Sequence, residues 1–387
     1  MNERSIGWNK IKLGLLGDFS KGSGITKNDL VQDGLPCVRY AELYTKFDFI
    51  IPFCISFISE ETAKTAKPIQ KRDILFAGSG ETKEEIGKCA VYLNDCCAYA
   101  GGDNIIFRTK QAEPLYLSFY LNTLGRKQLN KLGQGDSIVH IHSDDLKNVI
   151  IPLPPLPEQE KIAEILGTWD TAIEKLSALI EQKKQLKKGL MQRLLNFKKE
   201  YLKRFDEIFE DYSDKKHSDK DLLSATQENG VIPRRLLKGR VMSPEGSLDG
   251  YKLVQSGSFV ISLRSFQGGL EYSDYEGIIS PAYTVLKDKI PINKCFYRYF
   301  FKSYNFIEKY LSIAVIGIRD GKQISYPDLQ SVKIPYPPLS EQKAIADILS
   351  KADEEITLLT RKLSALKTQK TGLMQKLLTG QIRVKAA

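Results

Sequence analysis

Apolar residues recur at alternating steps of four and three along two stretches of the chain. The first stretch runs from residue 162 to 194 and the second from residue 345 to 377. This spacing predicts two long helices whose apolar seams pack together as a coiled coil. The predicted seam positions are Ile162, Leu166, Ile173, Leu176, Ile180, Leu190 and Leu194 in the first helix, and Ile345, Leu349, Ile356, Leu359, Leu363, Leu373 and Leu377 in the second.

Lysines interrupt both seams at equivalent positions, Lys187 and Lys370. One interpretation is a polar pair that fixes the alignment of the two helices. The other is that the aliphatic stems cover apolar surface while the ammonium groups reach solvent. We favour the second interpretation from the sequence, and the first stays open.

The two helical stretches are copies of each other. Residues 152–159 read PLPPLPEQ and residues 335–342 read PYPPLSEQ, 183 residues further on. At that offset, without a gap, residues 145–195 and 328–378 are identical at 25 of 51 positions. A proline run cannot lie in a helix interior, and the following glutamate favours a helix start. The sequence therefore predicts an internal duplication, with a pseudo-two-fold axis that sets the helices antiparallel.

The segments outside the helices diverge in sequence but keep the same order of elements. NIIFRTK at residues 104–110 and YTVLKDK at residues 283–289 are typical of strands, and helical patterns follow near residues 115–132 and 295–311. DILFAGSG at residues 73–80 corresponds loosely to SFVISLRS at residues 258–265. These patterns predict a mixed α/β (α+β) fold, with two globular domains joined by two long antiparallel helices.

The predicted domain boundaries follow from this alternation. The globular domains are expected at residues 1–151 and 201–334, and the proline-rich entries with their helices at residues 152–200 and 335–387. A chain of 387 residues is long enough for two such domains.

Charge and composition narrow the classes of partner. The net charge of +10 suits a polyanion such as double-stranded DNA, because lysine and arginine release counterions from phosphates. No apolar run reaches the ~18 residues of a membrane span, and the N-terminus lacks the apolar core of a signal peptide. Six cysteines without a disulfide-rich pattern are expected to be free thiols. We therefore expect a cytoplasmic protein.

The duplicated helix entry resembles that of Type I restriction–modification specificity subunits. The matching stretches are IPLPPLPEQEKIAEIL at residues 151–166 and IPYPPLSEQKAIADIL at residues 334–349, and GIISPAYTVLK at residues 277–287 is a further stretch of this kind. The resemblance implies two target recognition domains, each reading one half of a bipartite gapped DNA site. It also implies that the helices set the spacing and dock methyltransferase subunits, two of them by symmetry.

The same resemblance implies that catalysis belongs to partner subunits. Methylation with S-adenosylmethionine, and translocation and cleavage with ATP and Mg²⁺, would be carried by methyltransferase and restriction subunits. This chain is then expected to hold no catalytic residues, no cofactor and no metal.

Two other classes of protein stay open. FAGSG at residues 76–80 matches the F-x-G-x-G of S-adenosylmethionine loops, which would suit a DNA methyltransferase with its own active site. However, the chain has no NPP[YF] or DPP[YF] tetrapeptide and no G-x-x-x-x-G-K-[ST] phosphate loop. A coiled-coil adaptor that binds proteins and not DNA is the other alternative, and it predicts a shallow salt dependence of DNA binding.

Candidate DNA contacts are polar side chains placed on loops and strand ends. Arginine, lysine, asparagine, glutamine and serine side chains supply most contacts to phosphates and base edges. In the first domain the candidates are Lys21, Arg39, Tyr40, Ser79, Thr82, Lys83, Gln134 and His140. In the second they are Arg234, Arg235, Arg240, Arg264, Gln267, Arg319, Lys322 and Gln323.

Overall fold

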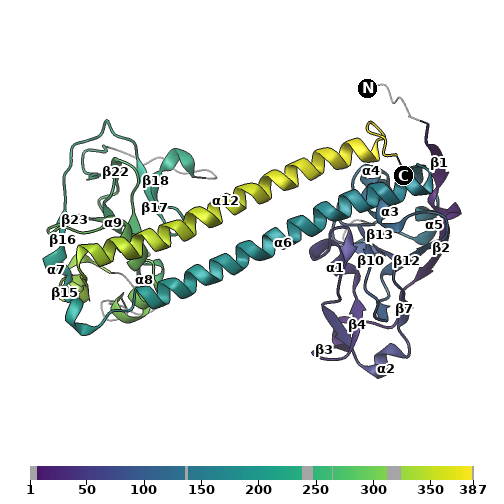
Figure 1. Cartoon of the computed structure of the whole chain (residues 1–387), viewed down its shortest axis with the longest axis horizontal. Helices are drawn as coiled ribbons and strands as arrows, with labels where there is room; N and C mark the ends of the chain where they lie inside the picture. Colours follow the sequence, from purple (N-terminus) through teal and green to yellow (C-terminus); the bar gives the residue numbers. More distant parts are fainter. Residues whose placement is uncertain (1–6, 136–137, 238–246, 264, 312–323, 386–387) are drawn as a thin grey trace. The chain divides into compact units, whose positions relative to one another are not determined.

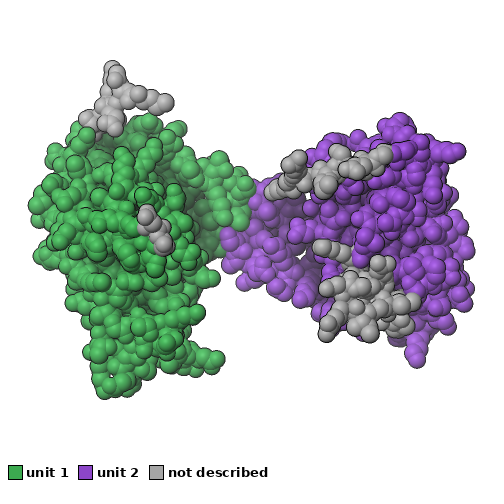
Figure 2. All heavy atoms as spheres, turned by 180° about the vertical axis from the view of Figure 1, so that it is seen from behind, with its two compact units in different colours: residues 1–175, 363–387 green, residues 176–362 purple. Residues whose placement is uncertain are grey.

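The computed structural model describes residues 7–135, 138–237, 247–263, 265–311 and 324–385. The chain divides into two compact units. Unit 1 comprises residues 1–175 with 363–387, and unit 2 comprises residues 176–362 (Figure 2). Each unit therefore combines one globular part with half of each long helix.

Unit 1 contains two five-stranded mixed sheets and two short strand pairs. The first sheet has the order β2 (Gly17–Lys21), β12 (Asn104–Thr109), β8 (Ile74–Ala77), β10 (Cys89–Tyr92) and β5 (Ile50–Ile51). The second has the order β3 (Leu30–Val31), β6 (Ser56–Ile58), β4 (Leu35–Val38), β11 (Ala98–Ala100) and β7 (Lys67–Ile69). The short pairs are β1 (Asn9–Lys12) with β14 (Ile150–Leu153), and β9 (Ser79–Gly80) with β13 (Val139–His140).

The central strand β8 shows why the first sheet of unit 1 forms. All four of its residues are buried, and they alternate between the two faces of the sheet. Ile74 and Phe76 belong to the apolar cluster that includes the long helices, whereas Leu75 and Ala77 belong to the cluster on the other face. The helices around these sheets are α1 (Tyr40–Thr45), α2 (Glu60–Ala63), α3 (Pro114–Leu121), α4 (Arg126–Leu132) and α5 (Ser143–Lys147), with 3-10 turns at Leu13–Leu15 and Lys27–Asp29.

Unit 2 repeats the first of these sheets with four strands. Their order is β16 (Phe209–Tyr212), β23 (Thr284–Asp288), β20 (Phe259–Ile261) and β21 (Glu271–Tyr272). The short pairs are β15 (Leu202–Arg204) with β24 (Lys333–Pro335), β17 (Leu223–Thr226) with β18 (Gly230–Pro233), and β19 (Lys252–Val254) with β22 (Gly277–Ile279). The helices are α7 (Phe205–Ile208), α8 (Ser265–Gly268), α9 (Lys294–Phe300), a π-helix (Phe306–Leu311) and α11 (Tyr326–Gln330), with 3-10 turns at Lys199–Tyr201 and Arg234–Leu236.

The mixed fold class predicted from the sequence is confirmed, with differences of detail. The two expected strands are β12 and β23. The single helix expected near residues 115–132 is divided into α3 and α4 by the turn at residues 122–125. The helix expected near residues 295–311 is likewise divided into α9 and the π-helix. The predicted domain boundaries stay a prediction about which segments fold as modules.

The two long helices are α6 (Leu156–Leu194) and α12 (Leu339–Leu378), drawn in teal and yellow in Figure 1. Each begins two residues before the glutamate expected to open it. Every predicted seam residue is buried or partly buried, whereas most other positions of the two helices are exposed. The helices run antiparallel within each unit, because the partner's residue number falls as the number along α6 rises. Pairs in unit 1 join residue 158 to 383 and 170 to 370, and pairs in unit 2 join 183 to 355 and 187 to 353.

The seam lysines form the same ion pair in both units. Lys370 binds Asp170 in unit 1, and Lys187 binds Asp353 in unit 2 with 2.5 Å between Nζ and Oδ1. Lys370 and Asp170 lie 183 residues beyond Lys187 and before Asp353, so each copy's lysine meets the other copy's aspartate. The solvent-reaching interpretation that we favoured is therefore wrong. A buried polar pair of this kind fits the alternative, in which the lysines fix the alignment of the helices.

A buried glutamine ties α6 to the globular part of unit 1. The Nε2 of Gln159 donates to the carbonyl of Pro154 at 2.7 Å, and its Oε1 accepts from the backbone N–H of Glu113 at 2.9 Å. Glu113 is the N-cap of α3. On the same helix the hydroxyl of Tyr116 donates to the carbonyl of Pro152 at 2.9 Å. The proline run and α3 thus hold the start of α6 in place.

The same attachment recurs in unit 2. The Nε2 of Gln342 donates to the carbonyl of Pro337 at 2.8 Å, and its Oε1 accepts from the N–H of Asn293 at 2.8 Å. Asn293 is the N-cap of α9, and the hydroxyl of Tyr297 on that helix donates to the carbonyl of Pro335 at 2.8 Å. The duplicated proline–glutamine motif is therefore the joint between a globular part and its long helix.

Candidate DNA-recognition surfaces

Three of the candidate residues of the first domain line one cavity in unit 1. Lys21 at the end of β2, Ser79 on β9 and His140 on β13 enclose a space of about 270 Å³. They are 58 and 61 residues apart in the chain, and the sheet brings them together. Residues that we did not select, such as Ser20 and His142, complete the lining with residues of the turn after β13.

Ser79 and His140 are directly hydrogen-bonded across β9 and β13. The two residues are register partners in the antiparallel pair, and the serine Oγ lies 2.9 Å from the histidine Nδ1. Ser79 is only 3% exposed, whereas His140 is exposed. Because the serine occupies Nδ1, the second ring nitrogen of His140 is left to contact a ligand. The buried serine therefore orients an exposed imidazole.

The remaining candidates of the first domain fall into two groups. Thr82, Lys83 and Gln134 are exposed, and the backbone of Gln134 exchanges two hydrogen bonds with that of His140. Arg39 is held by the buried Glu42, whose carboxylate accepts from both the backbone N–H and the Nε of the arginine at 3.2 Å. The charge of Arg39 is thus already paired inside the fold.

Tyr40 is also committed to the fold. It begins α1, its ring lies 6.2 Å from that of Tyr44, and both rings pack against the apolar cluster on the second face of the sheet. A DNA contact by Tyr40 would have to use the edge that stays accessible.

Three candidates of the second domain are described. Arg235 is exposed and pairs with Asp221 at 3.2 Å, and the Nε of Arg234 donates to Ser224 at 3.2 Å. Gln267 is exposed on α8. The other candidates, Arg240, Arg264, Arg319, Lys322 and Gln323, lie outside the described residues.

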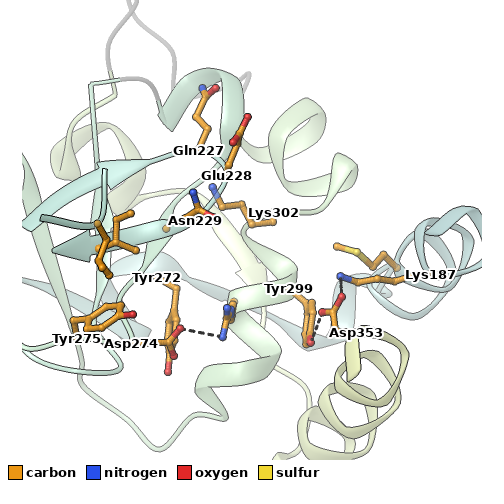
Figure 3. A pocket seen from close by; sticks show the side chains of 15 residues that line it. Lys187, Gln227, Glu228, Asn229, Tyr272, Asp274, Tyr275, Tyr299, Lys302 and Asp353 are labelled. Atoms are coloured by element: carbon orange, nitrogen blue, oxygen red, sulfur yellow. Dashed lines mark hydrogen bonds and ion pairs between the residues drawn. The ribbon is translucent and has the colours of Figure 1, made fainter. Parts of the chain in front are cut away.

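Unit 2 holds a larger cavity that the sequence did not indicate. It encloses about 790 Å³ between α9, the turn of the β17–β18 hairpin and the two long helices (Figure 3). Tyrosines at positions 272, 275 and 299 and polar residues of the hairpin turn line it. These residues share no sequence periodicity, so only the fold assembles them.

The FAGSG segment is not a ligand loop in this structure. Phe76 and Ala77 end the buried strand β8, and Ser79 and Gly80 form β9. A Cβ on Gly78 would meet the carbonyl oxygen of Asp103 at 2.7 Å, so this glycine permits close packing of two backbones. A turn and then β10 follow, whereas a nucleotide-binding glycine loop opens a helix.

Comparison with known proteins identifies the family. Two parts of the chain, residues 5–185 and 203–368, match the family described as Type I restriction modification DNA specificity domain. These two matches cover most of the chain.

The chain belongs to the Type I restriction modification DNA specificity family. The MjaVIII specificity subunit of Methanocaldococcus jannaschii is 32% identical over 353 residues, covering 82% of this chain and 80% of the relative. The putative MjaX specificity subunit of the same organism is 29% identical over 342 residues, covering 81% and 79%. Both are named as Type I restriction enzyme subunits.

A solved structure agrees with the fold of this family member. The S subunit of the Type I restriction–modification system from M. genitalium has a TM-score of 0.59, with 17% identity and 97% of each chain covered. Among the described residues, no helix is long and apolar enough to cross a membrane. The internal duplication seen in the sequence is the family domain present twice.

Proposed function

We propose that this chain is the sequence-specific DNA-recognition subunit of a Type I restriction–modification complex. The globular part of each unit reads one half of a bipartite gapped site, and the long helices set the spacing and dock two methyltransferase subunits. The observation that carries the proposal is the duplication: two divergent globular parts are joined to near-identical helices by the same buried glutamine. Variable modules on a constant frame suit a protein that reads different half-sites.

Catalysis in this proposal belongs to the partners. Methyltransferase subunits use S-adenosylmethionine, restriction subunits use ATP and Mg²⁺, and this chain works with them in the cytoplasm as a non-catalytic subunit. The geometry of the FAGSG segment supports this division over a methyltransferase active site, because strands and not an open loop carry its glycines. A chain of net charge +10 also suits binding to a duplex.

Selection of bound duplexes from a random DNA library tests the proposal. The chain is co-purified with its methyltransferase subunits, and enriched sequences are read after several rounds. We expect two short motifs at a constant gap, one for each globular part. A single contiguous motif would mean that only one unit reads DNA. No enrichment from an intact complex would favour the protein adaptor.

The cavity of unit 1 gives a prediction about individual contacts. His140→Ala is expected to weaken binding of the cognate site by about 1–3 kcal/mol and to relax the preference at one base position. Lys21→Gln is expected to weaken all duplexes alike and to lower the salt slope by about 1, as loss of a phosphate contact does. Fluorescence anisotropy of the complex with cognate and altered duplexes at several salt concentrations measures both.

A matched control is available on the same unit. Lys71 is half-exposed and paired with Asp95, and it does not line the cavity. Lys71→Gln should therefore change neither affinity nor salt slope. If His140→Ala binds every duplex as the parent chain does, the cavity is not a reading site.

A further inference from the structure

The two sheets can be superimposed strand for strand through their registers. In unit 1, Ile74 on β8 faces Val91 on β10 and Phe107 on β12. In unit 2, Phe259 on β20 faces Tyr272 on β21 and Leu286 on β23. Strand β10 is therefore equivalent to β21, and Val91 is equivalent to Tyr272.

The edge next to these strands differs between the units. In unit 1 the edge is β5, parallel to β10, with Ile51 beside Tyr92. In unit 2 the start of β18 takes this place, with an isolated parallel bridge between Val231 and Ser273. Counting back two residues from Ile51 and from Val231 places Asn229 of unit 2 at the position of Phe49 in unit 1.

In unit 1, Phe49 fills the space between the sheet and the long helices. Its ring centroid lies 4.7 Å from that of Phe119 on α3, and the ammonium of the seam lysine Lys370 lies 4.4 Å from the Phe49 ring. Its carbonyl accepts from the hydroxyl of Ser118 at 2.9 Å. Lys370 is consequently only 6% exposed.

In unit 2 the equivalent space is open. Asn229 is an exposed residue of the hairpin turn, and the seam lysine Lys187 is 22% exposed (Figure 3). Tyr299, which replaces Ser118, reaches across and donates to Asp353 at 2.8 Å. The cavity of about 790 Å³ is what remains where unit 1 holds a phenylalanine.

The charges around this cavity are already satisfied by the protein. Lys187 pairs with Asp353 at 2.5 Å, and Arg298 lies 3.5 Å from Asp274. Lys302 binds both carboxylate oxygens of the buried Glu271 at 2.7 Å. A phosphate would have to break these pairs, whereas an aromatic ring would lie against tyrosine faces and the lysine stem without doing so.

We propose that the cavity of unit 2 receives an aromatic side chain of the methyltransferase subunit that docks on the long helices. The inference rests on the proposed function, because it takes that subunit as the partner. The partner's ring stands where Phe49 stands in unit 1, over Lys187 and Tyr299. Unit 1 supplies its own ring, so the two docked methyltransferase subunits are held unequally, and the one at unit 2 has the additional anchor.

The variant Asn229→Phe tests this inference by filling the cavity from within. The substituted ring is expected to raise the Tm of the isolated chain by about 2–4 °C, because it buries apolar surface in an existing space. It should weaken binding of one methyltransferase subunit by about ten-fold while the other binds as before. Calorimetric titration of the full chain with that subunit resolves the two sites, and Asn229→Ala, which leaves the cavity open, serves as the control.

The outcomes separate this inference from the function on which it rests. A raised Tm with both sites unchanged overturns the inference and leaves the function intact. No binding of methyltransferase subunits to the parent chain contradicts the function itself. If Asn229→Phe does not fold, a photoreactive benzoylphenylalanine at exposed Gln227 decides: a crosslink to an aromatic residue of the methyltransferase supports the inference, and crosslinks to DNA or none overturn it.

Discussion

The Tm of unit 1 is expected to fall by about 10 °C when Lys370 is replaced by methionine, from a loss of about 3–5 kcal/mol. The ammonium of Lys370 is the counter-ion of Asp170, and its side chain is 8% exposed. The Oδ2 of Asp170 is buried without a hydrogen-bond partner among the described residues. Removing the lysine therefore leaves a largely desolvated carboxylate with no compensation. Differential scanning calorimetry of the full chain measures the change.

The loss should depend on pH in a definite direction. Burial raises the pKa of Asp170, and the lysine beside it opposes that rise. Without the lysine the folded-state pKa rises further, so the variant is least destabilised where the carboxyl is protonated and loses stability as pH rises through that value. The difference in Tm between parent and variant is expected to narrow as pH is lowered from 7.5 to 5.

Two control variants isolate the ion pair. Adding Asp170→Leu to the methionine variant should restore most of the loss, since no charge is then buried. Lys187→Met in unit 2 should cost less, because Asp353 is 43% exposed and keeps the hydrogen bond from Tyr299. Equal losses at the two lysines would contradict this account of burial.

Replacing Gln159 by methionine is expected to destabilise the chain by about 2–5 kcal/mol, and Gln342→Met by a similar amount. Each glutamine is at most 1% exposed and satisfies one backbone N–H and one proline carbonyl. Methionine keeps the volume but leaves both backbone groups unpaired, at about 1–3 kcal/mol each. The measurement is the Tm of each variant and its resistance to limited proteolysis at the helix entry.

The neighbouring glutamates provide the comparison for this experiment. Glu158 binds Arg383 at 2.7 Å, and Glu341 at the equivalent position of the second copy is partly exposed. Glu341→Gln should therefore change the Tm little. A loss at Gln159 without one at Gln342 would show that the two joints are not equivalent.

The sequence anticipated the helical frame more fully than the surfaces that read DNA. The seam from Ile162 to Leu194 and its copy follow a local period, and local period is what fixes a helix face. Lys21, Ser79 and His140 were selected as separate polar residues, and nothing in their spacing showed that they share a cavity. The DNA contacts themselves stay predictions.

By itself, the sequence determined the duplication, the antiparallel helices and the mixed fold, because repeats and periods are properties of neighbouring residues. Only the tertiary structure decided which lysine meets which aspartate, how Ser79 orients His140 and why Asn229 leaves a cavity where Phe49 leaves none. These are contacts between residues far apart in the chain. They depend on strand register and helix alignment, which a one-dimensional pattern constrains only weakly.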